Sequence, residues 1–212
     1  MISLIESFLA VFIPIFVIVD SPGLIPVYLS LTERFSEDDK KRIVNKAVIV
    51  ASVVLIIFAF FGNFILNLLH ITIEAFEVAG GILLFIIGVE MLFAKKSGTT
   101  HSKEQEQEAL EKENIAIFPL AIPLLTGPGA ITTVITLMNI SQTTEKILII
   151  FAIILTFLIS KIILDKSSKI MKYLGKTGIQ VITRISGIIV SAIAVQFVMN
   201  GINIFLMRVI VL

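Results

Sequence analysis

The sequence predicts an all-α polytopic membrane protein whose six transmembrane helices form two inverted three-helix repeats. Three observations predict this class. The chain of 212 residues is 57% hydrophobic and only 16% charged, whereas a soluble domain carries roughly a quarter charged residues. Its apolar residues form runs at or near the ~20-residue length that crosses a bilayer. Lysine and arginine gather in every second connection, and sequence features recur after half of the chain length.

Six spans fit the hydropathy, and two of them are interrupted. The first span contains Asp20-Ser21-Pro22-Gly23, and the fourth contains Thr126-Gly127-Pro128-Gly129. The opening MISLIESFLA lacks a basic region and a small-residue cleavage site, so it is expected to begin the first span rather than to be a removed signal peptide. The expected spans are 3–32, 43–62, 71–93, 115–138, 146–164 and 183–206.

The charges of the connections predict how the spans are oriented. Basic residues are abundant after spans 1, 3 and 5, are missing from residues 63–71, and are reduced to Lys146 after span 4. Because connections rich in Lys and Arg stay in the cytoplasm, both termini are expected outside it. The residues of the rich connections are Arg34, Lys40, Lys41, Arg42 and Lys46, then Lys95, Lys96, Lys103 and Lys112, then Lys166, Lys169, Lys172 and Lys176.

Several positions recur at an offset of 106 residues, which is half of the chain. Pro22-Gly23 corresponds to Pro128-Gly129, and Gly81 corresponds to Gly187. With three spans in each half, the second copy enters the membrane from the opposite side, as in many secondary transporters. Channels also use inverted repeats, so the repeat narrows the class without deciding it. We expect a first repeat over 1–96, a polar cytoplasmic linker over 97–114 that is a short helix or disordered, and a second repeat over 115–212.

Both interruptions have the chemistry of one helix ending and another beginning. Pro favours the first position of a helix, and Ser or Gly before it suits the N-cap. The new half-helices would direct free N–H groups and positive dipole ends into the protein, where they suit a substrate carboxylate. Packed proline kinks are the structural alternative. The candidate substrate-binding residues are Asp20, Ser21, Pro22, Gly23, Thr126, Gly127, Pro128, Gly129, Thr132 and Thr133.

Individual residues near the interruptions have alternative roles. Asp20 is the one acid that these boundaries place deep in a span, which makes it a candidate for binding a proton or a substrate amine. A local helix cap is its alternative role. Thr132 and Thr133 could each bond the backbone of their own helix instead of a ligand. The glycines Gly80, Gly81 and Gly187 are expected to allow close helix packing.

The chain lacks the residues that several functional classes need. The chain has no cysteine and two histidines, His70 and His101, so a zinc site is not expected. Neither histidine lies in an expected span, so a serine nucleophile would lack a base, and no Walker-type phosphate loop occurs. We therefore expect no enzyme, no catalytic residues, no cofactor and no metal. The net charge of +1 gives no indication of nucleic-acid binding.

Four stretches resemble signature regions of the MarC/SnatA family of UPF0056-type membrane proteins. They are DSPGLIPVYLSLT, EAFEVAGGILLFIIGVEMLF, FPLAIPLLTGPGAITTVI and RISGIIVSAIAVQFVMNGI, and they come from both halves of the chain. The resemblance implies a six-span inner-membrane protein, with members that move small neutral amino acids such as glycine, alanine and threonine. It also implies export as the direction. The family often has Asp-Pro at the first interruption, where this chain has Asp20-Ser21-Pro22.

Three functions remain open at this point. The first is a secondary transporter of small neutral amino acids, which binds its substrate between the interruptions and uses a proton or sodium ion. The second is a channel or facilitator for a small uncharged solute. The third is an intramembrane enzyme or a structural membrane partner, and the missing acid–base cluster argues against the enzyme. The expected partners are the amino acid, the coupling ion and the lipid bilayer.

Overall fold

A computed structural model describes residues 4–93 and 115–210, and the regular secondary structure in these ranges is helical. In order, the helices are α1 (Leu4–Val19), α2 (Ser21–Leu31), α3 (Glu37–Leu68), α4 (Ile73–Leu92), η1 (Ala116–Leu125), α7 (Pro128–Ile140), α8 (Thr143–Asp165) and α9 (Ser167–Ile210). Within these ranges, five segments are long and apolar enough to cross a membrane, or six if η1 and α7 form one bent span. The all-helical, multi-span architecture is thus confirmed. The linker expected over 97–114 lies outside the described residues.

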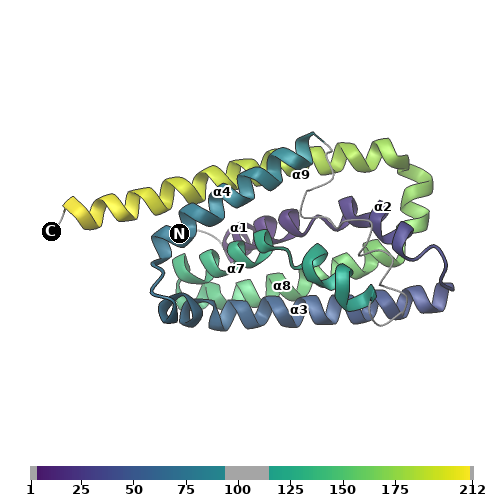
Figure 1. Cartoon of the computed structure of the whole chain (residues 1–212), viewed down its shortest axis with the longest axis horizontal. Coiled ribbons are helices and arrows are strands. Elements are labelled where there is room, and N and C mark those ends of the chain that lie inside the picture. Colours follow the sequence, from purple (N-terminus) through teal and green to yellow (C-terminus); the bar gives the residue numbers. More distant parts are fainter. Residues whose placement is uncertain (1–3, 94–114, 211–212) are drawn as a thin grey trace.

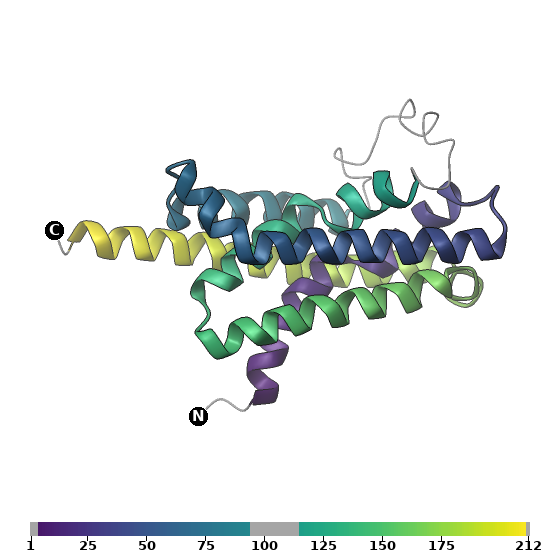
Figure 2. The ribbon, with the colours of Figure 1, turned by 90° about the horizontal axis from the view of Figure 1, so that it is seen from below.

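The helices lie in pairs along one long axis. In Figure 1, α4 and α9 run side by side along one edge, α3 and α8 run along the opposite edge, and α1 and α7 lie between them. Figure 2 shows that α1 is steeply inclined to the long helices. A large buried apolar cluster joins α1, α3, η1, α7 and α8, and a smaller one lies between α4 and α9. The buried apolar residues therefore form two cores, one in the main bundle and one between α4 and α9.

Polar residues explain where α3 and α4 begin. Ser36 caps α3, because its side chain accepts a hydrogen bond of 3.2 Å from the N–H of Asp39. Three acidic residues in the first turn of α3 also suit its positive dipole end. Thr72 caps α4 in the same way, at 3.3 Å from the N–H of Ala75. These capping residues therefore set where the two apolar helices begin.

The outward faces of the long helices are apolar. Phe60, Phe151 and Phe205 are exposed by 60%, 55% and 57%, and each comes from a different helix. Soluble monomers rarely expose large apolar patches. In a bilayer the same side chains contact lipid.

The structure corrects the expected boundaries of two spans. α3 runs from Glu37 to Leu68, well beyond the expected 43–62, because its cap lies in the polar flank and the helix continues past the hydrocarbon-length run. α9 begins at Ser167 rather than at 183. It bends at Gly175, whose φ of 64° is a left-handed conformation that glycine adopts readily.

The segment before the second interruption also differs from the expected α-helix. η1 consists of wide helical turns in which Phe118 (φ −129°, ψ 123°) and Ile122 (φ −125°, ψ 122°) are extended. Each of them precedes a proline, which disfavours the α conformation of the residue before it. Two prolines four residues apart therefore prevent a regular helix here.

Glycines allow α4 to approach its neighbours closely. A Cβ at Gly81 would lie 2.8 Å from the carbonyl oxygen of Ala194 in α9, and a Cβ at Gly187 would lie 2.8 Å from that of Gly88. Gly80 instead faces α7, where a Cβ would overlap the methyl group of Thr132. The packing role predicted for these glycines is confirmed.

We expect Gly88→Val to destabilise the α4–α9 pair. A Cβ at this position would overlap Oγ of Ser191 and lie 3.0 Å from the carbonyl oxygen of Gly187, and overpacking of this kind costs ~1–3 kcal/mol. Thermal unfolding in detergent should show a lower midpoint. The control is Ile188→Val, since Ile188 is 59% exposed on the outward face. Equal midpoints for the two variants would contradict the close approach of the helices.

Candidate functional site

The chain changes course at both interruptions. α1 ends at Val19 and α2 begins at Ser21, while Asp20 between them has φ 41° and ψ 49°, in the left-handed region. Thr126 and Gly127 separate η1 from α7, and the two axes differ by 55°. In both places a proline stands in the first turn of the new helix. The first turns of α2 and α7 are therefore distinct helix starts.

The Asp20 carboxylate lies between the start of α2 and the side of α9. A Cβ at Gly23 would overlap Oδ2 and would lie 2.8 Å from Oγ1 of Thr183. The carboxylate thus faces the N–H of Gly23 and the hydroxyl of Thr183. The other oxygen, Oδ1, is buried and has no hydrogen-bond partner among the described residues. This oxygen can accept a bond from a donor that the surrounding side chains do not supply.

Ser21 faces α8 rather than α9. Its buried Oγ donates a hydrogen bond to Oγ of Ser160, which donates in turn to the carbonyl oxygen of Thr156 at 2.8 Å. Oγ1 of Thr156 is also buried and lacks a partner within residues 4–93 and 115–210. Pro22 follows, half-buried, in the first turn of α2. Ser21 therefore ties the start of α2 to a polar face of α8.

The threonines near the second interruption bond mainly within their own segment. Oγ1 of Thr126 donates to the carbonyl oxygen of Ala121 at 2.8 Å, and Oγ1 of Thr133 donates to that of Gly129 at 2.8 Å. A hydroxyl has one proton to donate, so neither Thr126 nor Thr133 has a proton left to donate to a ligand. Thr132 is directed at α4, where its methyl group occupies the space beside Gly80.

The start of α7 lies against the end of α1. Gly129 is buried, and a Cβ there would lie 3.1 Å from the side chains of Ile18 in α1 and Ile87 in α4. Ile18 stands two residues before Asp20, so this contact brings the two interruptions next to each other. Gly127 and Pro128 are less deeply placed, since Gly127 is half-buried and Pro128 is exposed.

Three polar residues near these helices were missed from the sequence. Glu74 and Glu77, which are 4% and 0% exposed, are buried more completely in the protein than Asp20, the one acid expected deep in a span. Both stand close to the start of the expected span 71–93. They are buried because α9 covers them: a Cβ at Gly201 would lie 2.7 Å from the Glu74 carbonyl oxygen and 3.3 Å from Cβ of Glu77. The third residue is Thr183. The 106-residue offset relates Thr183 to Glu77, so the repeat was a sequence signal that links these two positions.

Comparison with known proteins now identifies the family. Residues 5–206 match the model of a family described as MarC family integral membrane protein. The chain belongs to the MarC family. This confirms the resemblance of its four signature stretches, which in this MarC-family protein contain both interruptions and both buried glutamates.

Relatives of this MarC-family protein match it over nearly their whole length. A UPF0056 membrane protein of Methanocaldococcus jannaschii is 38% identical over 199 residues, which cover 93% of this chain and 97% of the relative. One of Pyrococcus abyssi is 37% identical over 204 residues, covering 96% and 98%. The YvbG protein of Bacillus subtilis, also a UPF0056 membrane protein, is 38% identical over 199 residues, covering 91% and 92%. No solved structure matches the chain.

Proposed function

We propose that this MarC-family protein is a secondary transporter, and in the cell an exporter, of small neutral amino acids such as glycine, alanine or threonine. The substrate would bind between the two interruptions and reach each side of the membrane in turn. The observation that carries the proposal is the contact between Gly129 and Ile18, because it brings the start of α7 against the interruption between α1 and α2. The family resemblance of both segments adds to it.

The two charged ends of an amino acid suit the groups around these interruptions. The first turn of α7 has N–H groups without helical partners and a positive dipole end, which favour a substrate carboxylate, whereas the start of α2 already faces the Asp20 carboxylate. The buried Oδ1 of Asp20 lacks a donor within the described chain, and a substrate ammonium group would supply one. Ile18 and Ile87 beside Gly129 favour a substrate with a short side chain.

The glycine contacts between α4 and α9 support two inverted repeats. Gly81 meets Ala194, and Gly187 meets Gly88. The 106-residue offset converts Gly81 into Gly187 and Gly88 into Ala194, so it exchanges the two contacts. A two-fold axis between antiparallel helices produces this relation. Two halves related in this way could rock against each other and expose a central site alternately.

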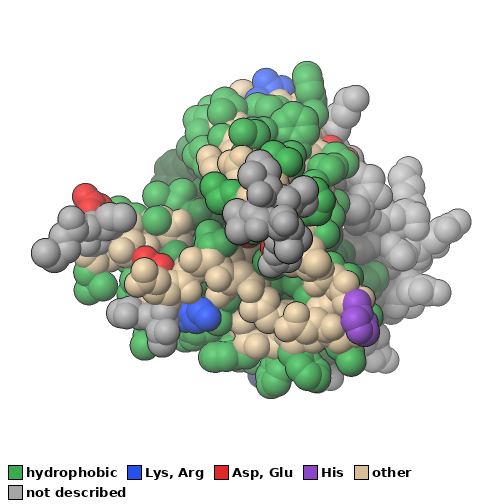
Figure 3. Space-filling view, turned by 90° about the vertical axis from the view of Figure 1, so that its left-hand side faces the viewer, with side chains coloured by type: hydrophobic (Ala, Val, Ile, Leu, Met, Phe, Trp, Pro, Cys, Tyr) green, Lys and Arg blue, Asp and Glu red, His purple; other side chains and the backbone are tan. Residues whose placement is uncertain are grey.

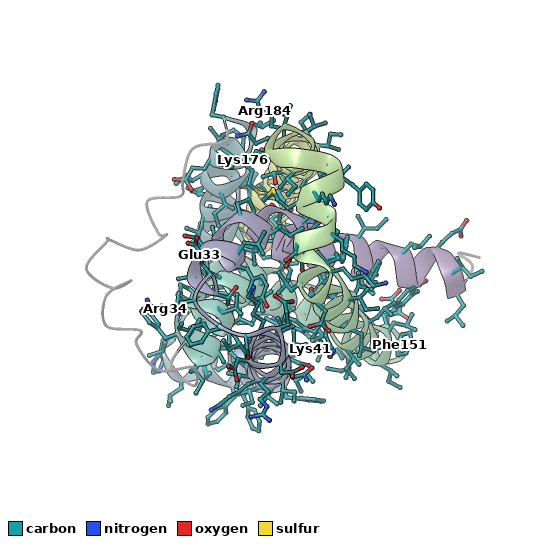
Figure 4. The ribbon with its side chains drawn as sticks, turned by 90° about the vertical axis from the view of Figure 1, so that its right-hand side faces the viewer. Glu33, Arg34, Lys41, Phe151, Lys176 and Arg184 are labelled. Atoms are coloured by element: carbon teal, nitrogen blue, oxygen red, sulfur yellow. The ribbon has the colours of Figure 1, made fainter. Side chains whose placement is uncertain are left out.

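Basic side chains at one end of the bundle support the proposed orientation. Figure 4 looks onto this end, where the labelled residues Arg34, Lys41, Lys176 and Arg184 come from the α2–α3 connection, α3 and α9. Connections rich in Lys and Arg remain in the cytoplasm. We therefore assign this end to the cytoplasmic side of the cell (inner) membrane, with both termini on the other side.

Flux measurements in reconstituted vesicles test the proposal. Labelled glycine, alanine and threonine should enter with saturable kinetics, L-alanine should be preferred over D-alanine, and unlabelled substrate should compete. A channel or facilitator built on the same repeats would instead give non-saturating flux with little response to an ion gradient. That result would replace the transporter by the alternative, and the absence of flux for every amino acid would reject both.

We expect Asp20→Asn to weaken substrate binding. The amide preserves the size of the side chain but removes the charge opposite the substrate ammonium, and a hydrogen bond to a charged group contributes ~1.5–3 kcal/mol. The half-saturating substrate concentration should rise by roughly tenfold to a hundredfold. The matched control is Asp165→Asn at the end of α8, where Asp165 pairs with Lys161 at 2.6 Å. An unchanged half-saturating concentration for Asp20→Asn would contradict the ammonium role.

A further inference from the structure

Glu77 of α4 is a carboxylate that lies entirely inside the protein. Its side chain is 0% exposed, and neither oxygen has a hydrogen-bond partner among the described residues. An ionised carboxylate without a partner is costly in a low-dielectric interior, whereas the neutral acid is tolerated far better. The burial of Glu77 therefore favours a group that holds a proton.

An open cavity of about 540 Å³ lies one helical turn away from Glu77. It is at the end of the bundle where α3 turns into α4, and Figure 3 looks onto this end. Glu74 of α4 and Asn139 of α7 line it, and Glu74 precedes Glu77 by three residues on the same helix face. The other polar side chains of the lining include Asn63, Asn67 and His70. A polar cavity of this size gives water access to the helix turn next to Glu77.

The contacts on either side place Glu77 level with Thr136 of α7. The cavity brings the two helices together at one end, and the contact between Gly80 and Thr132 brings them together one turn deeper. Glu77 and Thr136 stand between these points on the facing stripes of α4 and α7. Thr136 is 0% exposed, and its Oγ1 also has no partner within the described chain. One level of this helix contact thus holds two buried polar groups that are unsatisfied.

The described stretches of α7 and α9 that pack against Glu77 offer no charge that would hold it ionised. α7 has no ionisable side chain, and neither do residues 194–205 of α9, which surround the covering Gly201. The ionisable neighbours among the described side chains are Glu74, one turn away, and His70 in the cavity beyond it. No group of three His, Asp or Glu side chains within residues 4–93 and 115–210 could hold a metal ion. The surroundings of Glu77 therefore suit a proton and not a metal.

The repeat relates Glu77 to the proposed substrate site. Adding 106 to Glu77 leads to Thr183, which faces Asp20, and adding 106 to Asp20 leads to Thr126. The first half thus has an acid at each of these two positions, and the second half has a threonine at each. Asp20 lies in the interrupted span of the first half and Glu77 lies on α4 of the same half, so Glu77 is the second acid that the repeat does not duplicate.

We propose that Glu77 is the proton-binding group of this protein and is reached from the cavity at the α3–α4 end. The carboxylate takes up a proton to form a neutral acid and later releases it, so only an O–H bond forms and breaks. The coupling of this step to amino acid movement rests on the proposed function, whereas proton binding by Glu77 does not.

Carbodiimide labelling tests proton binding without any substrate. N,N′-dicyclohexylcarbodiimide reacts with protonated carboxyl groups in apolar surroundings, and mass spectrometry of peptides locates the adducts. In wild-type protein, Glu77 should be modified at acidic pH and progressively spared as the pH rises. The comparison residue is the exposed Glu37, paired with Lys40 at 2.8 Å, which should stay unmodified. An adduct at Glu77 that is absent at every pH, or that does not vary with pH, would overturn the proposal.

Transport by Glu77→Gln tests the coupling. In vesicles, a pH gradient should no longer drive accumulation of labelled alanine, with a loss of at least about tenfold, while exchange of labelled for unlabelled alanine at equal pH persists. The matched control is Glu37→Gln, which should behave as wild type. Gradient-driven accumulation by Glu77→Gln would reject the coupling role. If the wild-type protein moves no amino acid, the proposed function fails, and the labelling result alone decides whether Glu77 binds a proton.

Discussion

Replacing Gly129 with leucine is expected to abolish transport and to leave membrane insertion intact. The first added carbon would lie 3.1 Å from Ile18 and Ile87, and the rest of the side chain must enter the space between α1, α4 and α7. There it would cover the N–H groups at the start of α7 that we assign to the substrate carboxylate. Leucine itself is favourable in a membrane helix, so the amount of inserted protein should not fall. Flux per inserted protein should decrease by at least about tenfold.

Two further variants separate site blockage from general overpacking. Gly62→Leu places the same side chain in the contact between α3 and α7, where a Cβ would lie 2.5 Å from Cγ1 of Ile135. It should lower the thermal midpoint at least as much as Gly129→Leu, since overpacking costs ~1–3 kcal/mol, yet retain flux. Gly129→Ala should fall between wild type and Gly129→Leu. Wild-type flux from Gly129→Leu would remove the start of α7 from the substrate site.

Gly23→Ala is expected to raise the half-saturating substrate concentration by at least about tenfold. A single methyl group here overlaps Oδ2 of Asp20 and lies 2.8 Å from Oγ1 of Thr183, so the carboxylate has to leave its position at the start of α2. Alanine is a better helix former than glycine by ~1 kcal/mol, so α2 itself should not be weakened. The effect therefore belongs to the displaced carboxylate.

The control for Gly23→Ala lies in the same helix. Ser30→Ala changes an exposed residue near the other end of α2 and should leave binding unaltered. Thermal midpoints of both variants show whether the fold is preserved. Equal half-saturating concentrations for the two variants would show that the position of the Asp20 carboxylate does not matter to the substrate.

The multi-span helical architecture could be predicted because hydrophobic length is a local property of the sequence. The ends of α3 could not be placed from hydropathy, since the cap at Ser36 extends the helix into the polar flank. The irregular η1 was missed because its apolar composition suggested a helix, although Phe118 and Ile122 each precede a proline. Here local backbone preference overrides the hydrophobic pattern.

The candidate site was harder to predict, because burial near a span end depends on a distant segment. Glu77 stands six residues after the start of the expected span 71–93, and the packing of Gly201 against it shows that it is enclosed. Thr183 stood at an expected span boundary. Only its position beside Asp20 in the structure makes it a candidate site residue. Proline and glycine indicate a helix end from the local sequence alone. The side chains that contact those helix ends come from the other half of the chain, which the local sequence does not indicate.

The bend at Gly175 gives α9 two parts with different surroundings. The short part carries Lys169 and Lys172 together with Tyr173, which is 87% exposed. Lysine stems and tyrosine rings settle where acyl chains meet headgroups, so this part can rest on the leaflet while the longer part crosses it. A change in the tilt of the long part would then move these lysines relative to the lipid headgroups. The content of anionic lipid in that leaflet would therefore affect how readily the long part tilts.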